Sequence, residues 1–146
     1  MRLLPPRPRL LTDGSEGAEG RGLFVLSAFH LAAGDLQGVD IRILNGPEVV
    51  RVAAEALRWE TGLSVEVAPP DADIMAELAG ASLFAAVAAR STDHLPLAQI
   101  AARGIRSLIA VQFPLPGAGA AAMTLVRAAH DPRELGARIL AVLRLP

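Results

Sequence analysis

The polar segment Arg90–His94 has the residue types and the position of an anion-binding loop. It follows the apolar run Ser82–Ala88, which is typical of a central parallel strand covered on both faces. It precedes a helix that opens with Leu95 and Pro96, and proline is favoured in a first helical turn because its missing N–H would have no partner there. Open α/β sheets bind anionic ligands at such loops, between a parallel strand and a helix N-terminus.

Two residues of this loop could also do acid–base chemistry. Asp93 and His94 are adjacent, and a carboxylate hydrogen-bonded to an imidazole can move a proton. The alternative is that Asp93 caps the following helix while His94 is exposed. The sequence leaves both interpretations open.

A second candidate loop, Asp13–Gly22, follows the short apolar run Arg9–Thr12 and is rich in glycine and acidic residues. Its one basic residue, Arg21, carries a planar guanidinium that suits phosphate, which makes it a candidate phosphate ligand. The alternative is a solvated loop arginine. Glu16 and Glu19 are expected to be solvated acids that would repel a phosphate.

Strand and helix patterns alternate along the whole chain. Strands are expected at Arg9–Thr12, Val39–Leu44, Ser64–Ala68, Ser82–Ala88, Ser107–Val111 and Met123–Val126. Helices are expected at Leu23–Ala33, at Glu48–Thr61, after an N-cap at Asp71 or Asp73, at Leu97–Arg103, and at Pro132–Leu145 after an N-cap at Asp131. This alternation predicts right-handed crossovers and one parallel sheet of about six strands, with Val39–Leu44 and Ser82–Ala88 inside it.

We therefore predict one three-layer, Rossmann-like α/β domain over residues 1–146, with a proline-rich lead at 1–8. Apolar spacing also assigns the buried residues of the helices. On the first three helices these are Leu23, Leu26, Ala28 and Leu31; Val49, Val52, Ala53, Ala56 and Leu57; and Ile74, Met75 and Leu78. Trp59 is expected to be partly buried.

Missing residue types exclude several kinds of site. There is no cysteine, which excludes disulfides, thiol nucleophiles and cysteine-bound metals. All 14 basic residues are arginine, which excludes a phosphate-binding loop with a Gly-Lys-Ser/Thr sequence and a Schiff base. The three histidines have no metal-ligand spacing, so we expect no metal and no cofactor.

Charge and hydropathy exclude further partners. The net charge is −1 and aromatic residues make up 3% of the chain, so nothing indicates nucleic-acid binding. No apolar run reaches the roughly 18–20 residues of a membrane span. The segment MRLLPPRPRL has no apolar core of signal-peptide length, so we expect no signal peptide. We expect a cytoplasmic protein, and the bias towards Ala, Arg, Gly and Pro is typical of a GC-rich bacterial genome.

The segment LLTDGSEGAEGRGLFVLSAF resembles a motif of the glycosyltransferases that are built from two Rossmann-like domains, in their C-terminal, donor-binding half. The motif is a strand, a loop with a glycine-arginine pair and a lysine-glycine pair, and then a helix. Gly14 and Ser15 stand at the first pair, and Arg21 and Gly22 at the second. In that family the two cations hold the donor's diphosphate, so the resemblance implies that Arg21 keeps one contact and that Ser15 lacks the other charge.

A second motif lies in ARSTDHLPLAQIAARGIRSLIA. In the family one glutamate lies near the sugar, and another, eight positions later, binds the ribose hydroxyls. Ser91 and Gln99 occupy these positions here, and Pro96 and Leu97 match the turn into the helix. The segment HDPRELGARILAVL resembles a late helix of the family.

The resemblance implies a domain that binds a nucleotide diphosphate sugar and transfers the sugar when combined with an N-terminal acceptor-binding domain. The implied donor-binding residues are Gly14, Ser15, Arg21, Gly22, Ser91, Asp93, His94, Leu95, Pro96 and Gln99. The alternative is a degenerate, non-catalytic α/β module used for interaction or scaffolding, which the changed charged positions favour.

Overall fold

The structure is a computed structural model, and it describes residues 7–17, 19–91, 93–111, 123–127 and 131–144. Most of the proline-rich lead and Thr92 therefore lie outside the described residues. The strands are β1 (Arg9–Asp13), β2 (Asp40–Leu44), β3 (Ser64–Val67), β4 (Leu83–Ala88), β5 (Arg106–Val111) and β6 (Met123–Arg127). The helices are α1 (Gly22–Leu31), α2 (Glu48–Thr61), α3 (Ile74–Leu78), α4 (Leu97–Ala102) and α5 (Pro132–Leu143).

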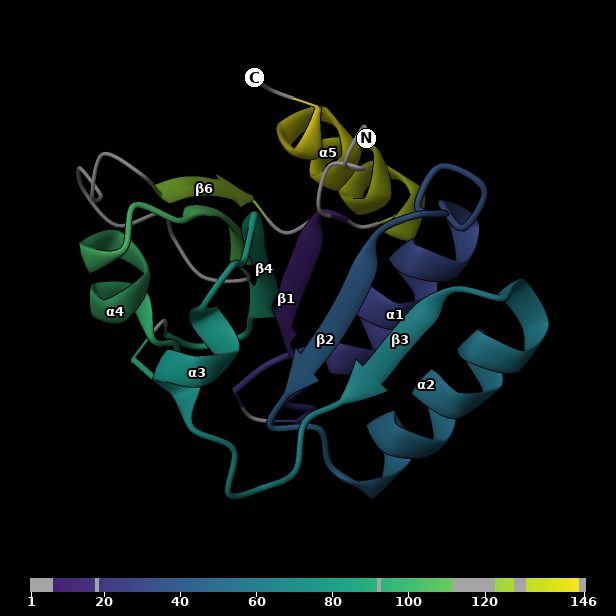
Figure 1. Cartoon of the computed structure of the whole chain (residues 1–146), viewed down its shortest axis with the longest axis horizontal. Coiled ribbons are helices and arrows are strands. Elements are labelled where there is room, and N and C mark those ends of the chain that lie inside the picture. The colour runs from purple at the N-terminus through teal and green to yellow at the C-terminus, as the bar shows by residue number, and fades with distance from the viewer. Residues whose placement is uncertain (1–6, 18, 92, 112–122, 128–130, 145–146) are drawn as a thin grey trace, which may run out of the picture.

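All strands pair in parallel, in the order β3-β2-β1-β4-β5-β6 (Figure 1). The predicted α/β fold with a parallel sheet is confirmed. Both β2 and β4 lie inside the sheet, as the sequence predicts. The chain order reverses between β1 and β4, and doubly wound sheets bind ligands at the carboxyl ends of the strands at such a switch point.

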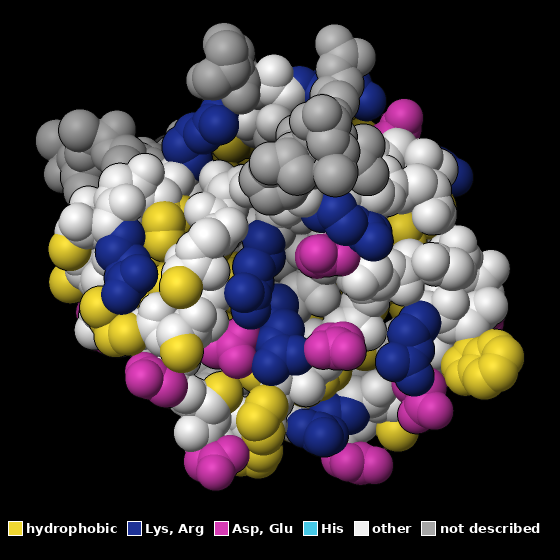
Figure 2. All heavy atoms as spheres, in the orientation of Figure 1, with side chains coloured by type: hydrophobic (Ala, Val, Ile, Leu, Met, Phe, Trp, Pro, Cys, Tyr) yellow, Lys and Arg dark blue, Asp and Glu magenta, His cyan; other side chains and the backbone are white. Residues whose placement is uncertain are grey.

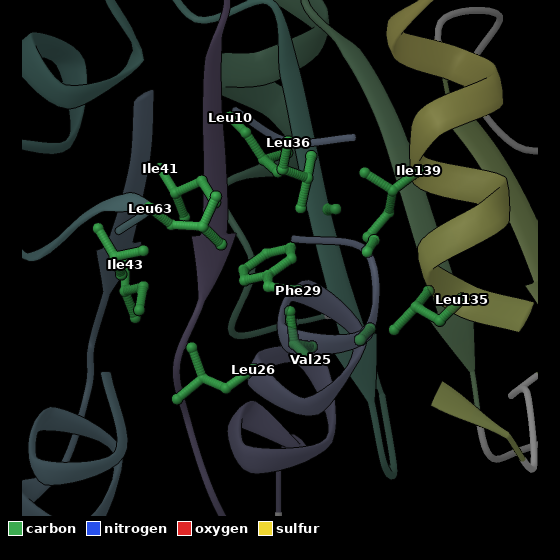
Figure 3. Close-up of a cluster of buried hydrophobic side chains, with 14 of the residues drawn as sticks. Leu10, Val25, Leu26, Phe29, Leu36, Ile41, Ile43, Leu63, Leu135 and Ile139 are labelled. Atoms are coloured by element: carbon green, nitrogen blue, oxygen red, sulfur yellow. The ribbon is translucent and has the colours of Figure 1, made fainter. Parts of the chain in front are cut away.

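Helices cover both faces of the sheet and bury two apolar clusters. On one face α1, α2 and α5 pack against alternate strand residues, with Phe29 of α1 at the centre of the cluster (Figure 3). On the other face Leu78 of α3 and Ile100 of α4 pack against Phe84 and Ile109 of the sheet. Because β4 is covered from both sides, all of its residues are buried, which is why its sequence is a continuous apolar run.

The helix caps follow the expected local chemistry. Asp73, not Asp71, caps α3 by accepting a hydrogen bond from the Met75 N–H at 3.0 Å. Asp131 caps α5 by accepting one from the Arg133 N–H at 2.9 Å. The N-cap predicted at Asp131 is confirmed.

The predicted buried face of α2 is correct at Leu57, which is buried, and at Ala53, which packs partly buried against the core. It is wrong at Val49 and Val52, which are 51% and 58% exposed, and at Ala56, which is also exposed; Val50 and Ala54 are buried instead. The helix has two apolar stripes, and the sheet covers the one that presents Val50. Trp59, predicted to be partly buried, is 80% exposed.

Two other expected burial positions are also wrong. On α1 the core takes Val25 and Phe29, and Leu31 is exposed. On α3 Met75 is 42% exposed. Periodicity finds a helix more reliably than it finds which of two apolar faces the sheet covers.

A charged network joins α3 to the sheet on the second face. Glu77 of α3 accepts two hydrogen bonds from the Arg42 guanidinium, at 2.9 and 3.0 Å, and one from Arg9 at 3.0 Å. Arg42 also reaches Glu66 of β3 at 2.7 Å. Figure 2 shows basic and acidic side chains side by side on this face, and the hydrogen bond from Arg42 holds the pKa of Glu77 below its usual value.

We predict that Glu77→Gln lowers the free energy of unfolding by about 1–3 kcal/mol at pH 7, because it weakens charge-assisted hydrogen bonds to two arginines. A carboxyl whose pKa is lowered by folding contributes stability above its ordinary pKa of 4.5 and loses it as the pH falls through the folded value. The difference between wild type and variant in urea unfolding should therefore shrink from pH 7 to pH 3.

The matched control is Glu66→Gln, because Glu66 binds the same Arg42 from a side chain that is 67% exposed. This variant should change stability by less than about 1 kcal/mol. Two results would contradict the stabilising role assigned to the buried Glu77 carboxylate. One is an equal loss of unfolding free energy in the two variants, and the other is a Glu77→Gln effect that grows at acid pH.

Candidate functional site

Three loops meet at the switch point of the sheet. They follow the carboxyl ends of β1, β2 and β4, and they contain Ser15, Asn45 and His94 respectively. The sequence predicts a ligand site in the first and third of these loops. The structure brings both to the same edge of the sheet, next to the N-terminus of α1.

One carboxylate contacts all three loops. Asp13, the last residue of β1, accepts hydrogen bonds at Oδ1 from Ser15 Oγ at 3.1 Å and from Asn45 Nδ2 at 3.2 Å. Its Oδ2 lies 3.4 Å from His94 Nε2. Asn45 holds a backbone φ of 59°, which turns its loop towards β1. Asp13 is therefore the common partner of the site.

The Asp13–His94 pair is buried. The side chain of Asp13 is 2% exposed and that of His94 is 12% exposed, and the geometry of their contact falls outside that of a hydrogen bond. Burial raises the pKa of Asp13, and the hydrogen bond from Asn45 and the charge of His94 oppose that rise. A carboxyl with a raised pKa beside an imidazole can exchange a proton, but the burial suits a contact that holds loops together.

The N-terminus of α1 already has acceptors from its own loop. The Gly22 N–H donates to the Ser15 carbonyl at 2.9 Å, and the Leu23 N–H donates to Glu16 Oε2 at 2.9 Å. A carboxylate at this end of a helix is favoured by the helix dipole. The expectation that Glu16 is a solvated loop acid is wrong, because it is partly buried and its carboxylate accepts a hydrogen bond from the Leu23 N–H.

Arg21 also turns towards its own loop. Its guanidinium donates to the carbonyls of Gly17 and Gly20, and its backbone N–H donates to the Val87 carbonyl at 3.3 Å. Gly20 forms a β-bridge with Ala88, next to the switch point. Arg21 is partly exposed and binds carbonyls of its own loop, and the loop is fastened to the end of β4.

Packing explains two of the glycines in this loop. A Cβ on Gly14 would collide with the Ile43 side chain, and a Cβ on Gly22 would collide with the Gly14 carbonyl. Both glycines allow the loop to fold closely against β2 and α1. A close approach of ligand phosphate is therefore not needed to account for them.

In the loop after β4, Asp93 and His94 neither pair with each other nor form a helix cap beside an exposed histidine. His94 pairs with Asp13 rather than with Asp93. Asp93 is exposed, with its N–H donating to Ser91 Oγ at 3.4 Å, and it does not cap α4, whose N-cap is Pro96. Sequence order puts Asp93 and His94 together, but the fold separates their side chains.

The remaining predicted residues are spread along this loop and α4. Leu95 is buried in the second apolar cluster, so only its backbone could reach a ligand. Gln99 is exposed on α4, and Ser91 is partly buried. The structure thus gathers Gly14, Ser15, Arg21, Gly22 and His94 at the switch point, and places Ser91, Asp93, Leu95, Pro96 and Gln99 along the adjoining segment.

Sequence reasoning missed Asp13, Asn45 and the capping role of Glu16. The available signal for Asp13 was an acid directly after an apolar strand. Asn45 lies in the turn after β2, and its side-chain amide donates to Asp13. Among the described residues, no cluster of three or more His, Cys, Asp or Glu side chains could hold a metal. No described helix is long and apolar enough to cross a membrane.

No protein-family model and no curated protein matches this chain. Among solved structures it resembles the trehalose 6-phosphate synthase from Burkholderia multivorans, with a TM-score of 0.74, 15% identity and 97% of this chain covered. It also resembles WaaG, a glycosyltransferase involved in lipopolysaccharide biosynthesis, with a TM-score of 0.66, 16% identity and 97% covered. The chain has a glycosyltransferase-like fold.

The chain spans only part of most of these proteins. It covers 36% of the trehalose 6-phosphate synthase chain and 39% of WaaG. It covers 86% of a third structure, the catalytic domain of the cholesterol-α-glucosyltransferase from Helicobacter pylori, with a TM-score of 0.65 and 19% identity. At these identities the likeness concerns the fold alone.

We predict that Asp13→Asn leaves the free energy of unfolding at pH 7 within about 1 kcal/mol of wild type, whereas Asp13→Ala lowers it by about 1–3 kcal/mol. The amide oxygen of asparagine can still accept from Ser15 and Asn45, and its NH₂ can face His94. Alanine leaves those buried donors without their acceptor.

The pH dependence of the stability of wild type and Asp13→Asn tests the direction in which folding shifts the pKa of Asp13. An acid whose pKa is raised by folding contributes most stability below its ordinary pKa of 3.8 and loses that contribution as the pH rises through the folded value. In urea titrations, wild type should lose stability relative to Asp13→Asn between pH 3.5 and pH 7. A relative gain over that range would show that the pKa of Asp13 is lowered instead.

Proposed function

We propose that this chain binds the nucleoside diphosphate portion of a sugar donor, as one half of a glycosyltransferase. The observation that carries the proposal is the switch point between β1 and β4, where the N-terminus of α1 meets Arg21 in a fold shared with glycosyltransferases. Anionic ligands of doubly wound sheets bind at this position.

The diphosphate would replace acceptors that the loop now supplies itself. Its oxygens would take the Leu23 N–H from Glu16 and one or both guanidinium hydrogen bonds of Arg21. Arg21 and the backbone amides would then meet the negative charge that develops on the leaving diphosphate. Gln99 would contact the ribose and Ser91 the sugar, both as neutral groups.

We expect the affinity to be weak. Ser15, Ser91 and Gln99 stand where the resembling family has charged side chains, and each charge-assisted hydrogen bond contributes roughly 1.5–3 kcal/mol. Two such losses shift a micromolar affinity towards the millimolar range. Displacing the Glu16 carboxylate adds a further cost.

The second candidate function is an interaction or scaffolding module without donor chemistry. The observation in its favour is that Gly22, Leu23 and Arg21 donate to acceptors of their own loop or of β4. In that case the loop keeps these internal hydrogen bonds and binds no nucleotide.

We predict that uridine or guanosine diphosphate at millimolar concentration shifts the NMR amide resonances of residues 14–22, 91–96 and Gln99. Glu16→Gln should tighten binding several-fold, because the neutral amide can still cap Leu23 but no longer repels phosphate. Glu19→Gln is the matched control, since the Glu19 side chain is exposed and its backbone carbonyl, not its carboxylate, accepts from the Ala89 N–H. Arg21→Ala should abolish the shifts.

If no amide resonance in these segments shifts for either wild type or Glu16→Gln, the proposed donor site is contradicted and the scaffolding function is favoured. Shifts that survive Arg21→Ala would place the nucleotide elsewhere. The unchanged resonances of β2 and β3 serve as the control that each variant is folded.

We also expect no sugar transfer by the purified chain alone. Positioning of two substrates in one cleft contributes on the order of 7–11 kcal/mol to such a reaction, and the proposed acceptor domain would form the other wall of that cleft. Incubation with a nucleotide sugar and small acceptors should release no diphosphate above the buffer rate. Sugar transfer by the purified chain would contradict the proposal that a separate acceptor-binding domain is required.

A further inference from the structure

The outward face of α2 carries an apolar stripe that the fold leaves uncovered. Val49, Val52 and Trp59 are 51%, 58% and 80% exposed, and Ala56 between them is also exposed. Their spacing of three, four and three residues puts them on one side of the helix. Within the described residues, three of the five exposed large apolar side chains lie on this stripe.

A groove continues the stripe towards α1. It encloses about 230 Å³ between the two helices and is lined by Leu23 and Leu26 of α1 and by Ala53 and Ala56 of α2, among others. Ala56 belongs to both the groove and the stripe. The wall of the groove also includes Ser27, His30 and Glu60. The apolar part of the groove adjoins the stripe at Ala56, and an apolar groove beside an apolar stripe is a geometry that accepts a second helix.

The residues that flank the stripe are acidic. With 100° of rotation per residue, Glu48 and Glu55 lie along one side and Glu60 along the other, and all three are exposed. His30 of α1 lies 3.6 Å from Glu60 at the groove. The basic residues of this helix, Arg51 and Arg58, lie farther round, at a different hollow beside β3 that Glu55 also lines. Glu48 and Glu60 are therefore the acidic flanks that lie away from these arginines.

The acidic flanks decide between possible occupants. A second copy of the chain, docked through the same stripe, would bring its flanking glutamates close to Glu48, Glu55 and Glu60. An anionic membrane surface would be repelled by the same charges, whereas helices that lie on membranes carry basic flanks. A helix with basic flanks would meet the glutamates with opposite charge.

We propose that the stripe formed by Val49, Val52, Ala56 and Trp59 docks an amphipathic helix of another protein, whose apolar face is flanked by arginine or lysine. At 14 residues, α2 is about 21 Å long and matches about four turns of such a partner. The surface lies on α2, on the face of the sheet that α1, α2 and α5 cover. The proposal is independent of nucleotide binding at the switch point.

Trp59 is the one tryptophan of the chain and lies on the proposed surface, so its fluorescence reports docking directly. The probe is a synthetic 21-residue helix with leucine at heptad positions a and d and arginine at e and g. The control peptide has glutamate in place of arginine. The arginine peptide should shift Trp59 emission to the blue and bind at least tenfold more tightly than the glutamate peptide, with the difference shrinking as salt rises.

Val52→Glu places a charge in the middle of the stripe and should weaken the arginine peptide at least tenfold. Met75→Glu is the matched control, because it makes the same kind of change at an exposed apolar residue of α3 and should leave binding unchanged. Both positions are exposed, so circular dichroism should show both variants folded.

Three results would overturn the proposal. Equal binding of the two peptides, or binding that survives Val52→Glu, would mean that the stripe does not select a basic helix. A dimer in light scattering that Val52→Glu dissociates would assign the stripe to a second copy. A blue shift with phosphatidylserine vesicles, and none with the arginine peptide, would assign it to a membrane surface.

Discussion

The arrangement of the loops at the switch point depends on one buried carboxylate. Asp13 ends β1, and its two oxygens contact side chains from the loops after β1, β2 and β4. A buried polar group costs free energy unless it is paired, so the hydrogen bonds from Ser15 and Asn45 to Oδ1 offset part of the cost of burying Asp13, and Oδ2 has only the charged group of His94 beside it. The same contacts fix where the Gly14–Arg21 loop lies, and with it the environment of the α1 N-terminus.

In this structure the loop after β1 itself supplies hydrogen-bond acceptors to the N-terminus of α1. The sheet order and the position of α1 are those of a doubly wound domain. The loop is nevertheless closed by Glu16, by the Ser15 carbonyl and by the bridge between Gly20 and Ala88. A ligand at the proposed site would compete with the Glu16 carboxylate, so the fold by itself does not establish binding.

Much of the architecture could be predicted from local pattern. The all-apolar β4 identifies a strand covered on both faces, and Asp131 before Pro132 identifies a helix start, because these signals lie within a few residues of one another. The contact between Asp13 and His94 could not be predicted in this way. It joins residues 81 positions apart, and it exists only because β1 and β4 are neighbours in the sheet.

The buried face of α2 was also mispredicted because tertiary packing, rather than local pattern, decides it. Val49, Val52 and Ala56 satisfy the helical period as well as Val50, Ala54 and Leu57 do, and only the position of the sheet selects the buried set. A second apolar stripe is not needed to fold the domain. Its exposure therefore indicates an interaction surface rather than a packing defect.

Hydrogen exchange of individual amides tests most directly whether Asp13 holds the closed loop. The amides of Gly22 and Leu23 should be protected in wild type and lose protection together in Asp13→Ala, because their acceptors lie in the loop that Asp13 fastens. The Gly62 amide, which donates to the backbone carbonyl of Arg58 at the C-terminal end of α2, should keep its protection. Unchanged protection of Gly22 and Leu23 in the variant would contradict the central role of Asp13.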